Sequence, residues 1–162
     1  MKIPVGGIQL ALRAAVAAGL SLALAQLFRL EFPIYAMIAA VIVTDLSASQ
    51  TRKLGLRRLV ATVLGAACGA TLGPLLPPGP VAVGLSILVA MVICILLRGQ
   101  DVAKVVGYIC GIVVLEHGAN PWSYAFFRFI ETVLGIGVAW LISLVPKLIR
   151  TDESGSQEPD AR

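Results

Sequence analysis

Residues 126–135 read FFRFIETVLG, and the last eight of these letters resemble an earlier stretch of the chain. RLVATVLG at 58–65 and RFIETVLG at 128–135 share the arginine and the closing Thr-Val-Leu-Gly at an offset of 70 residues. Chance similarity is one explanation, because the chain is rich in Leu, Val, Ala and Gly. The apolar segments around both stretches keep the same offset, which favours an internal duplication.

Composition assigns the class of protein. The chain has 162 residues, of which 58% are hydrophobic and 14% are charged. Soluble domains have about 45–50% apolar and about 25% charged residues, so this chain is typical of membrane proteins. The net charge of +4 does not indicate nucleic-acid binding. The basic residues lie beside apolar runs without interleaved aromatic residues, which is the pattern of topology determinants.

Six apolar segments follow one another along the chain. A membrane-spanning helix needs about 20 residues, with a range of about 17–25. The segments are residues 8–28, 33–47, 55–76, 80–98, 102–116 and 122–145, and the second and fifth are short. Prolines and glycine-rich turns separate several of them. The sequence therefore predicts an all-α integral membrane protein with six transmembrane helices within residues 1–148. The polar end at 149–162 is predicted to be a disordered cytoplasmic tail.

The duplication has a consequence for topology. The offset lays the first segment on the fourth, the second on the fifth and the third on the sixth. Repeat one then covers about residues 8–76 and repeat two about 80–146. Because three crossings are an odd number, the two repeats enter the membrane in opposite directions. We therefore predict a 3+3 inverted repeat, a recurrent transporter design with its binding site near the membrane midplane.

Lysine and arginine gather on one side of the predicted topology. The opposite side has Arg29, which Glu31 offsets, and an uncharged turn at 74–80. The basic residues of the first side are Lys2, Arg52, Lys53, Arg57, Arg58, Arg98, Lys104, Lys147 and Arg150. Cytoplasmic loops carry an excess of Lys and Arg, so both termini are predicted to be cytoplasmic.

Two opposite charges interrupt the last apolar segment. Arg128, like Arg58 in the first repeat, lies toward a segment end, so both side chains are expected to reach the headgroups. Glu131 lies deeper, about two and a half turns into its segment, and its counterpart in repeat one is Ala61. Glu131 either forms a charge-neutralising pair with Arg128 or faces a polar pathway and handles substrate or protons.

Other polar residues lie on helix faces that should point to protein or water. Arg13 and Asp45 match in depth near the cytoplasmic ends of the first two segments, so they are able to pair. Thr132 shares a helix face with Arg128. The candidate substrate or coupling residues are Arg13, Asp45, Arg58, Arg128, Glu131 and Thr132.

Glycines four residues apart form ladders in the third and fifth segments. Small residues at this spacing let membrane helices approach closely, so they predict tight packing without identifying a substrate. The candidate packing residues are Gly65, Gly69, Gly73, Gly107, Gly111 and Gly135.

The sequence lacks the patterns of enzymes. It has no nucleophile–base constellation, no phosphate-binding glycine loop and no metal-ligand cluster, so we predict neither an enzyme nor a metal or cofactor site. His117 has no potential co-ligands nearby in the sequence. Cys68, Cys94 and Cys110 lie within apolar segments and are expected to be small buried residues.

Four stretches carry a resemblance to a known family. They are Arg13 with the alanines after it, FPIYA at 32–36, SQTRKLGLRRLVATVLGAACG at 49–69, and FFRFIETVLGIGVAWLISLVP at 126–146. Together they resemble the membrane domain of the FUSC, or aromatic acid exporter, family, which includes fusaric acid resistance proteins. The resemblance covers about residues 8–146. The matching positions are Arg13, Lys53, Gly55, Arg58, Thr62, Gly65, Arg128, Glu131, Thr132 and Gly135.

The resemblance implies an efflux transporter for aromatic carboxylic acids in the bacterial inner membrane. Plant aluminium-activated malate channels are distant relatives of the same family. Many members have a large cytoplasmic domain or a doubled membrane unit, and we expect neither in this chain. A homodimer or a higher homo-oligomer is therefore expected.

Two functional hypotheses follow. In the first, the protein is an exporter, or alternatively a channel, for aromatic or other organic carboxylates, and Arg13, Arg58 and Arg128 supply positive potential. In the second, it is a non-transporting scaffold or assembly subunit whose charged pairs only lock helices together. A polar pathway lined by both halves favours the first, and fully paired charges favour the second. The expected partners are the lipid bilayer and a small organic anion, and not nucleic acid.

Overall fold

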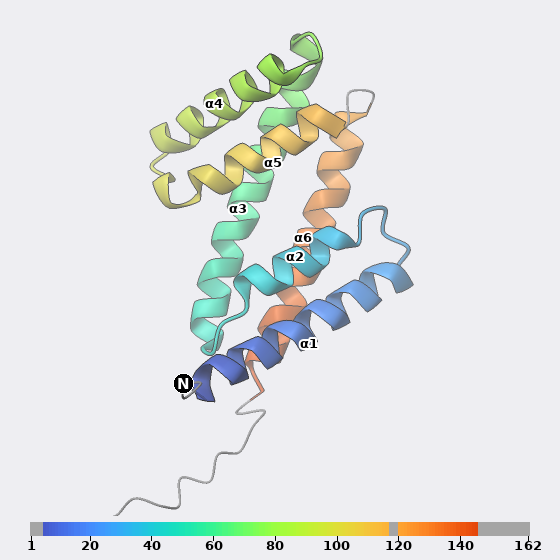
Figure 1. Cartoon of the computed structure of the whole chain (residues 1–162), viewed down its shortest axis with the longest axis vertical. Coiled ribbons are helices and arrows are strands. Elements are labelled where there is room, and N and C mark those ends of the chain that lie inside the picture. Colours follow the sequence, from blue (N-terminus) through green and yellow to red (C-terminus); the bar gives the residue numbers. More distant parts are fainter. Residues whose placement is uncertain (1–4, 117–119, 146–162) are drawn as a thin grey trace, which may run out of the picture.

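The computed structural model describes residues 5–116 and 120–145, and within these ranges the chain is helical without strands. Figure 1 shows the arrangement of the helices. The six α-helices are α1 (Val5–Leu27), α2 (Ile34–Val43), α3 (Ala48–Leu72), α4 (Pro80–Leu96), α5 (Ala103–Glu116) and α6 (Pro121–Ser143). Short 3-10 helices follow α3 at Gly73–Leu75 and precede α5 at Gln100–Val102. The six apolar segments of the sequence therefore form helices, as predicted.

Two of the three longest helices, α3 and α6, pack against each other through the middle of the molecule (Figure 1). The pair formed by α4 and α5 lies across one end, and the pair formed by α1 and α2 lies across the other. Helices of one half pack on helices of the other half, an arrangement that we call exchanged. Besides its neighbour α4, α5 packs mainly on α3 of the first half, and besides its neighbour α1, α2 packs mainly on α6 of the second half. The pair α4–α5 therefore covers α3, and the pair α1–α2 covers α6, each in the opposite half.

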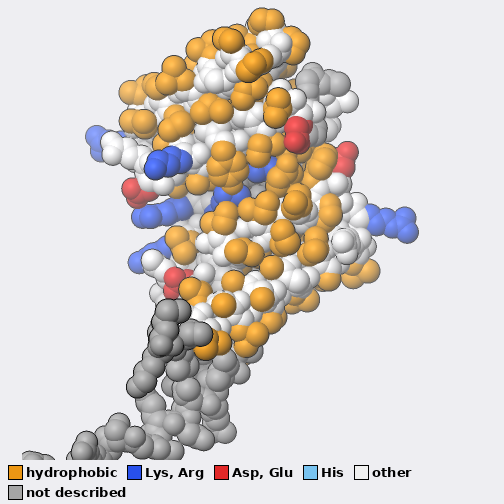
Figure 2. All heavy atoms as spheres, viewed as in Figure 1, with side chains coloured by type: hydrophobic (Ala, Val, Ile, Leu, Met, Phe, Trp, Pro, Cys, Tyr) orange, Lys and Arg blue, Asp and Glu red, His pale blue; other side chains and the backbone are white. Residues whose placement is uncertain are grey.

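Three helical stretches are long and apolar enough to cross a membrane, namely residues 6–27, 48–75 and 121–143. The helices at Ile34–Val43 and Pro80–Leu96 are apolar but shorter. In Figure 2, hydrophobic side chains cover most of the visible face, and charged ones gather at its left and right edges. The molecule is thus an all-helical protein with a surface suited to lipid, and six crossings stay a prediction.

The start of α3 differs from the sequence prediction. The third segment was expected to begin at 55, but α3 begins at Ala48, so Arg52 and Lys53 belong to its first turns and not to a loop. Asp45 organises the short connection before it. Its N–H donates to Thr51 Oγ1 at 3.0 Å, and its Oδ1 accepts from the N–H of Ser47 at 3.1 Å. These bonds allow the helix to start earlier than hydropathy suggests.

Matching turns follow α1 and α4. Arg29, after α1, has a φ of 51°, and Arg98, after α4, has a φ of 62°. In both turns the next residue's N–H donates 2.9 Å back to the carbonyl five positions earlier. This is the Schellman arrangement, which satisfies carbonyls at a helix end with one residue in the left-handed region. The same helix stop therefore occurs once in each half.

Two glycines allow the exchanged contacts. A Cβ on Gly65 of α3 would lie 2.7 Å from the carbonyl oxygen of Val106 in α5. A Cβ on Gly135 of α6 would overlap the carbonyl oxygen of Ala36 in α2. The offset of 70 residues relates the two contacts, because Gly65 corresponds to Gly135 and Val106 corresponds to Ala36. Each long helix can therefore meet the partner's backbone only because these positions lack a side chain.

The other glycines of the ladders differ in how tightly they pack. A Cβ on Gly69 would lie 2.6 Å from the Val113 side chain, and a Cβ on Gly107 or Gly111 would lie 2.9 Å from a side chain of α4. Gly73, in contrast, leaves 3.8 Å, an ordinary van der Waals distance. Close packing along α3 therefore ends before Gly73.

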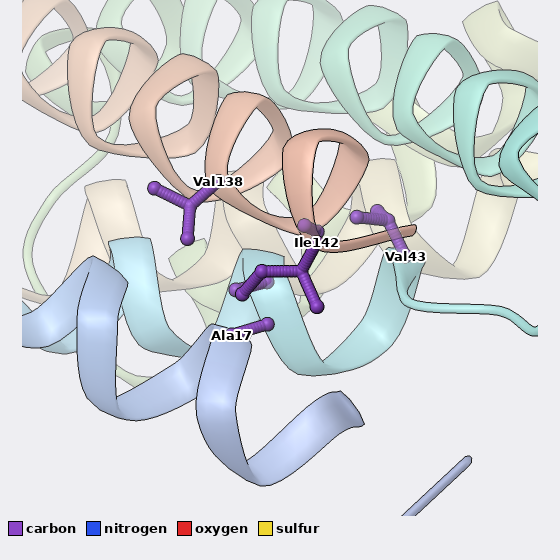
Figure 3. Packing of buried hydrophobic residues seen from close by; sticks show 6 residues of the cluster. Ala17, Val43, Val138 and Ile142 are labelled. Atoms are coloured by element: carbon purple, nitrogen blue, oxygen red, sulfur yellow. The ribbon is translucent and has the colours of Figure 1, made fainter. Parts of the chain in front are cut away.

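Small and branched residues fill the junction between α1, α2 and α6. Figure 3 shows Val138 and Ile142 of α6 close to Ala17 of α1 and Val43 of α2. All four are at least nine-tenths buried. Alanine at position 17 lets α1 approach closely enough for the branched side chains of the other two helices to fill the space.

Candidate functional site

Arg128 lies at the centre of an aromatic cluster between the halves. It is 2% exposed, and its guanidinium carbon lies 3.6 Å from the ring centroid of Tyr35 in α2. Its Nη1 donates to the Tyr124 hydroxyl at 3.2 Å, and that hydroxyl donates to the Tyr35 hydroxyl at 2.7 Å. Phe32 packs edge-on against Tyr124 with centroids 4.9 Å apart. The charge is thus held by π-faces and hydroxyls.

Glu131 lies one turn further along α6 and is fully buried. Its Oε1 accepts a hydrogen bond of 2.6 Å from the N–H of Phe32, just before the start of α2. Its Oε2 is buried without a hydrogen-bond partner. The ion pair found within 4.0 Å among the described residues joins Arg57 and Asp101 at the surface. Glu131 and Arg128 are therefore not in direct ion-pair contact, although their charges are close enough to attract each other.

The contact with Phe32 has a different counterpart in the other half. The residue that corresponds to Phe32 is Val102, whose N–H donates to the carbonyl of Gly99 at 3.1 Å, and the residue that corresponds to Glu131 is Ala61. Glu131 accepts from Phe32 near the N-terminus of α2, where a negative charge is favourable.

Arg58 is buried as well, which contradicts the expectation that it and Arg128 reach the headgroups. Arg58 is 5% exposed, lies in the middle part of α3 and is close enough to Arg128 for the two charges to repel. Its guanidinium carbon is 5.2 Å from the ring centroid of Tyr108 in α5. Its Nε and Nη1 are buried without hydrogen-bond partners. The crossing of α3 and α6 places these arginines inside protein, where snorkelling does not occur.

Arg13 donates hydrogen bonds to main-chain carbonyls just past the ends of α2 and α6. Its Nη1 donates to the carbonyl of Leu46 and its Nη2 to the carbonyl of Val145, both at 2.8 Å. The pairing of Arg13 with Asp45 suggested by depth is wrong, because Asp45 instead organises the turn before α3. Carbonyls past a helix C-terminus are good partners for a cation. Arg13 thus ties α1 to the ends of α2 and α6.

Thr132 and its counterpart Thr62 bond within their own helices. Thr132 Oγ1 donates to the carbonyl of Arg128 at 2.7 Å, and Thr62 Oγ1 donates to the carbonyl of Arg58 at 2.9 Å. Each threonine therefore bonds the helix turn that carries the arginine of its half. Their position favours a local structural contribution beside the site.

A hollow of about 440 Å³ opens beside the cluster. Phe32 and Tyr124 form its inner wall, and the exposed acids Glu31 and Glu116 lie at its rim. Because Phe32 and Tyr124 also contact Glu131 and Arg128, only one layer of residues separates the hollow from the buried charges. In Figure 2, Lys or Arg atoms are also visible at the centre of the face, between two hydrophobic bands.

Sequence reasoning did not name Tyr35, Tyr108 or Phe32 as residues of the site. Tyr124 lies four residues before Arg128, and this spacing predicts that the two share one helix face. Tyr35 and Tyr108 come from helices of the opposite half, so their contacts follow only from the packing. Phe32 acts through its main chain, which no side-chain pattern reveals.

Among the described residues, no group of three His, Cys, Asp or Glu side chains is placed to hold a metal ion. Cys68, Cys94 and Cys110 are free thiols. His117, Lys2, Lys147, Arg150 and the tail at 149–162 lie outside the described residues. The site offers two buried guanidinium groups, a buried carboxylate and aromatic faces.

Comparison with known proteins agrees with the resemblance. The profile of the family described as aromatic acid exporter family member 1 matches residues 9–145. The UPF0421 protein YgaE of Bacillus subtilis (strain 168) is 24% identical over 131 residues, which are 80% of this chain and 37% of that relative. The chain therefore spans just over a third of the length of this curated relative. No solved structure matches the chain. The chain belongs to the aromatic acid exporter family.

Proposed function

We propose that this protein is a membrane transporter that exports aromatic or other organic carboxylates. The observation that carries the proposal is the pair of buried guanidinium groups of Arg58 and Arg128, each set over a tyrosine ring of the opposite half. A benzoate-like ligand has the complementary features, because its carboxylate pairs with a guanidinium and its ring stacks on aromatic faces. Membership of the exporter family supports the same function.

A passive scaffold is less consistent with the charges. In such a protein each buried charge should have a partner, because an unsatisfied buried polar group costs about 1–3 kcal/mol. Arg58 keeps two buried nitrogens without partners, and Glu131 keeps one such oxygen. Buried unsatisfied groups of this kind call for an explanation, and a ligand or proton site is a common one.

Six crossings arranged as an inverted repeat form part of the proposal. The exchanged glycine contacts and the matching turns after α1 and α4 support it. Two surface grooves between α3 and α6 support it as well, because Leu59 and Val133 line one, and their counterparts Phe129 and Val63 line the other. An inverted repeat produces such pairs of equivalent features about an axis in the membrane plane.

The short helices fit the same proposal. With 10 residues, α2 is about 15 Å long, and with 14 residues α5 is about 21 Å long, against about 30 Å for the hydrocarbon core. Transporters of inverted-repeat design often use short or broken helices whose ends meet the binding site. The N-terminus of α2, next to Glu131, is such an end.

We propose an orientation with both termini in the cytoplasm of a bacterial cell, in its inner membrane. The exposed residues Arg52, Lys53, Arg57, Arg98 and Lys104 carry the positive charge of the inner side. In Figure 2, most of the visible Lys and Arg side chains lie along the left edge, together with Asp or Glu, which supports a membrane normal that runs across the view. Self-association as a homodimer stays a prediction, which light scattering of the purified protein in detergent tests.

Accumulation of labelled benzoate in intact cells tests the function and its direction. Cells that express the protein should hold less benzoate than control cells, and cells that express Arg58→Gln should behave like the controls. Arg57→Gln is the matched control, since this neighbouring arginine is 60% exposed and pairs at the surface. Equal accumulation in expressing and control cells, with the protein present in the membrane, would rule out benzoate export.

A further inference from the structure

The two central arginines have equivalent positions in the repeat but different surroundings. Arg128 is enclosed, because a tyrosine ring lies 3.6 Å from its guanidinium carbon and a second tyrosine accepts its Nη1 hydrogen bond. The hydroxyls of Tyr124 and Tyr35 then bond to each other at 2.7 Å. Arg128 thus has partners supplied by the protein.

Arg58 is enclosed less tightly. Tyr108 interacts with it through its hydroxyl, the ring centroid of Tyr108 lies 5.2 Å from the guanidinium carbon, and Tyr108 is 37% exposed. The position that corresponds to Tyr124 in the first half is Leu54, which has no hydroxyl to accept from Arg58. The Nε and Nη1 of Arg58 are left buried without acceptors. The halves therefore differ in sequence at this position, with Tyr124 beside Arg128 and Leu54 at the corresponding place beside Arg58.

From this asymmetry we infer that Arg58 is the residue that binds the carboxylate of the ligand, with Tyr108 as the platform for its ring. Arg128 is a positioning residue, which Tyr35 and Tyr124 hold in place and which adds positive potential. The inference rests on the proposed function and deepens it, because it assigns the ligand contact to one arginine of the two. A carboxylate oxygen is the acceptor that the free Arg58 donors lack.

The number of free guanidinium groups also sets the charge of the ligand. Of the two central arginines, only Arg58 keeps buried donors without hydrogen-bond partners, so the cluster offers one free guanidinium group. One carboxylate satisfies it. A dicarboxylate would bring a second negative charge that only the tyrosine-held Arg128 could meet, at a cost in desolvation. The site therefore favours aromatic monocarboxylates over dicarboxylates.

Equilibrium binding of radiolabelled benzoate to the purified full chain in detergent tests the assignment. Arg58→Lys and Arg128→Lys both keep the charge and remove the planar guanidinium. We expect Arg58→Lys to weaken benzoate binding by about tenfold and Arg128→Lys by less than about twofold, because only Arg58 contacts the carboxylate. Equal weakening by the two variants, or a larger effect at Arg128, would overturn the assignment.

Two further measurements test the assignment without the lysine variants. Tyr108→Leu, at a partly exposed position, should weaken binding of benzoate but not of acetate, which has no ring. Freeing Arg128 by Tyr124→Phe should restore part of the benzoate binding that Arg58→Gln loses. Acetate and benzoate affected alike by Tyr108→Leu, or no recovery in the Arg58→Gln/Tyr124→Phe double variant, would contradict the inference.

Competition by unlabelled compounds tests the ligand class. Benzoate should compete better than phthalate, its dicarboxylate analogue, and benzamide should not compete because it carries no charge. Stronger competition by phthalate would overturn the preference for monocarboxylates. If the wild-type protein binds no benzoate, the proposed function fails together with the inference. If the wild type binds benzoate and the lysine variants behave alike, only the inference fails.

Discussion

Replacing Gly135 by alanine tests the exchanged packing of the halves. The added Cβ would overlap the main-chain oxygen of Ala36 and would also lie 3.0 Å from the Cβ of Ala39. A main-chain atom cannot rotate away as a side chain can, so α2 and α6 must move apart. Gly137 lies two residues further along the same helix, and a Cβ there meets nothing within 4 Å. Gly137→Ala is therefore the matched control.

The two substitutions should change stability in opposite directions. Overpacking costs about 1–3 kcal/mol, and the higher helix propensity of alanine returns about 1 kcal/mol. Because the clash at Gly135 involves backbone, we expect a net loss of about 2 kcal/mol there. Gly137→Ala should gain up to about 1 kcal/mol. The free energies of unfolding of the two variants should thus differ by about 3 kcal/mol.

Unfolding in mixed micelles, by titration with sodium dodecyl sulfate and followed by circular dichroism, measures this difference. Gly65→Ala should resemble Gly135→Ala, because its Cβ would lie 2.7 Å from the carbonyl oxygen of Val106. If Gly135→Ala and Gly137→Ala unfold at the same detergent fraction, α2 does not contact α6 as described, and the exchanged arrangement is wrong.

Three further outcomes are expected. Arg13→Ala should destabilise the protein by about 2–5 kcal/mol in the same titration, because two carbonyl groups lose a charged donor; a loss below about 0.5 kcal/mol would contradict the contacts. The double change Arg128→Leu/Glu131→Leu should not recover the stability lost by either single change, since the two groups are not paired; full recovery would show a pair. Single cysteines at 50 and 78, in a background without cysteine, should be labelled from opposite sides of the membrane; labelling from one side would refute the topology.

Local sequence signals predicted the helices well. Prolines and apolar segment lengths located all six, and the short second and fifth segments became the two shortest helices. The start of α3 was misplaced because its first turns are polar. The hydrogen bonds around Asp45 that support this start form with Ser47 and Thr51 and leave no hydropathy signal.

The site was predictable only in part. Charge within an apolar segment identified Arg58, Arg128 and Glu131, but their partners come from helices distant in the sequence. Glu131 bonds to the main chain of Phe32, which is 99 residues away. Depth along a single helix suggested that the arginines reach the headgroups, and the crossing of α3 and α6 buries them instead. Such contacts are set by tertiary packing, which single-segment patterns do not contain.

Efflux of labelled benzoate from proteoliposomes that contain only this protein tests the central claim most directly. The wild type should release benzoate with a rate that saturates with concentration and rises when unlabelled benzoate is present on the opposite side, as a carrier does. Arg58→Gln should reduce the rate to that of empty liposomes, while Arg57→Gln should leave it unchanged. Release by wild-type protein no faster than from empty liposomes, or full activity of Arg58→Gln, would contradict the account.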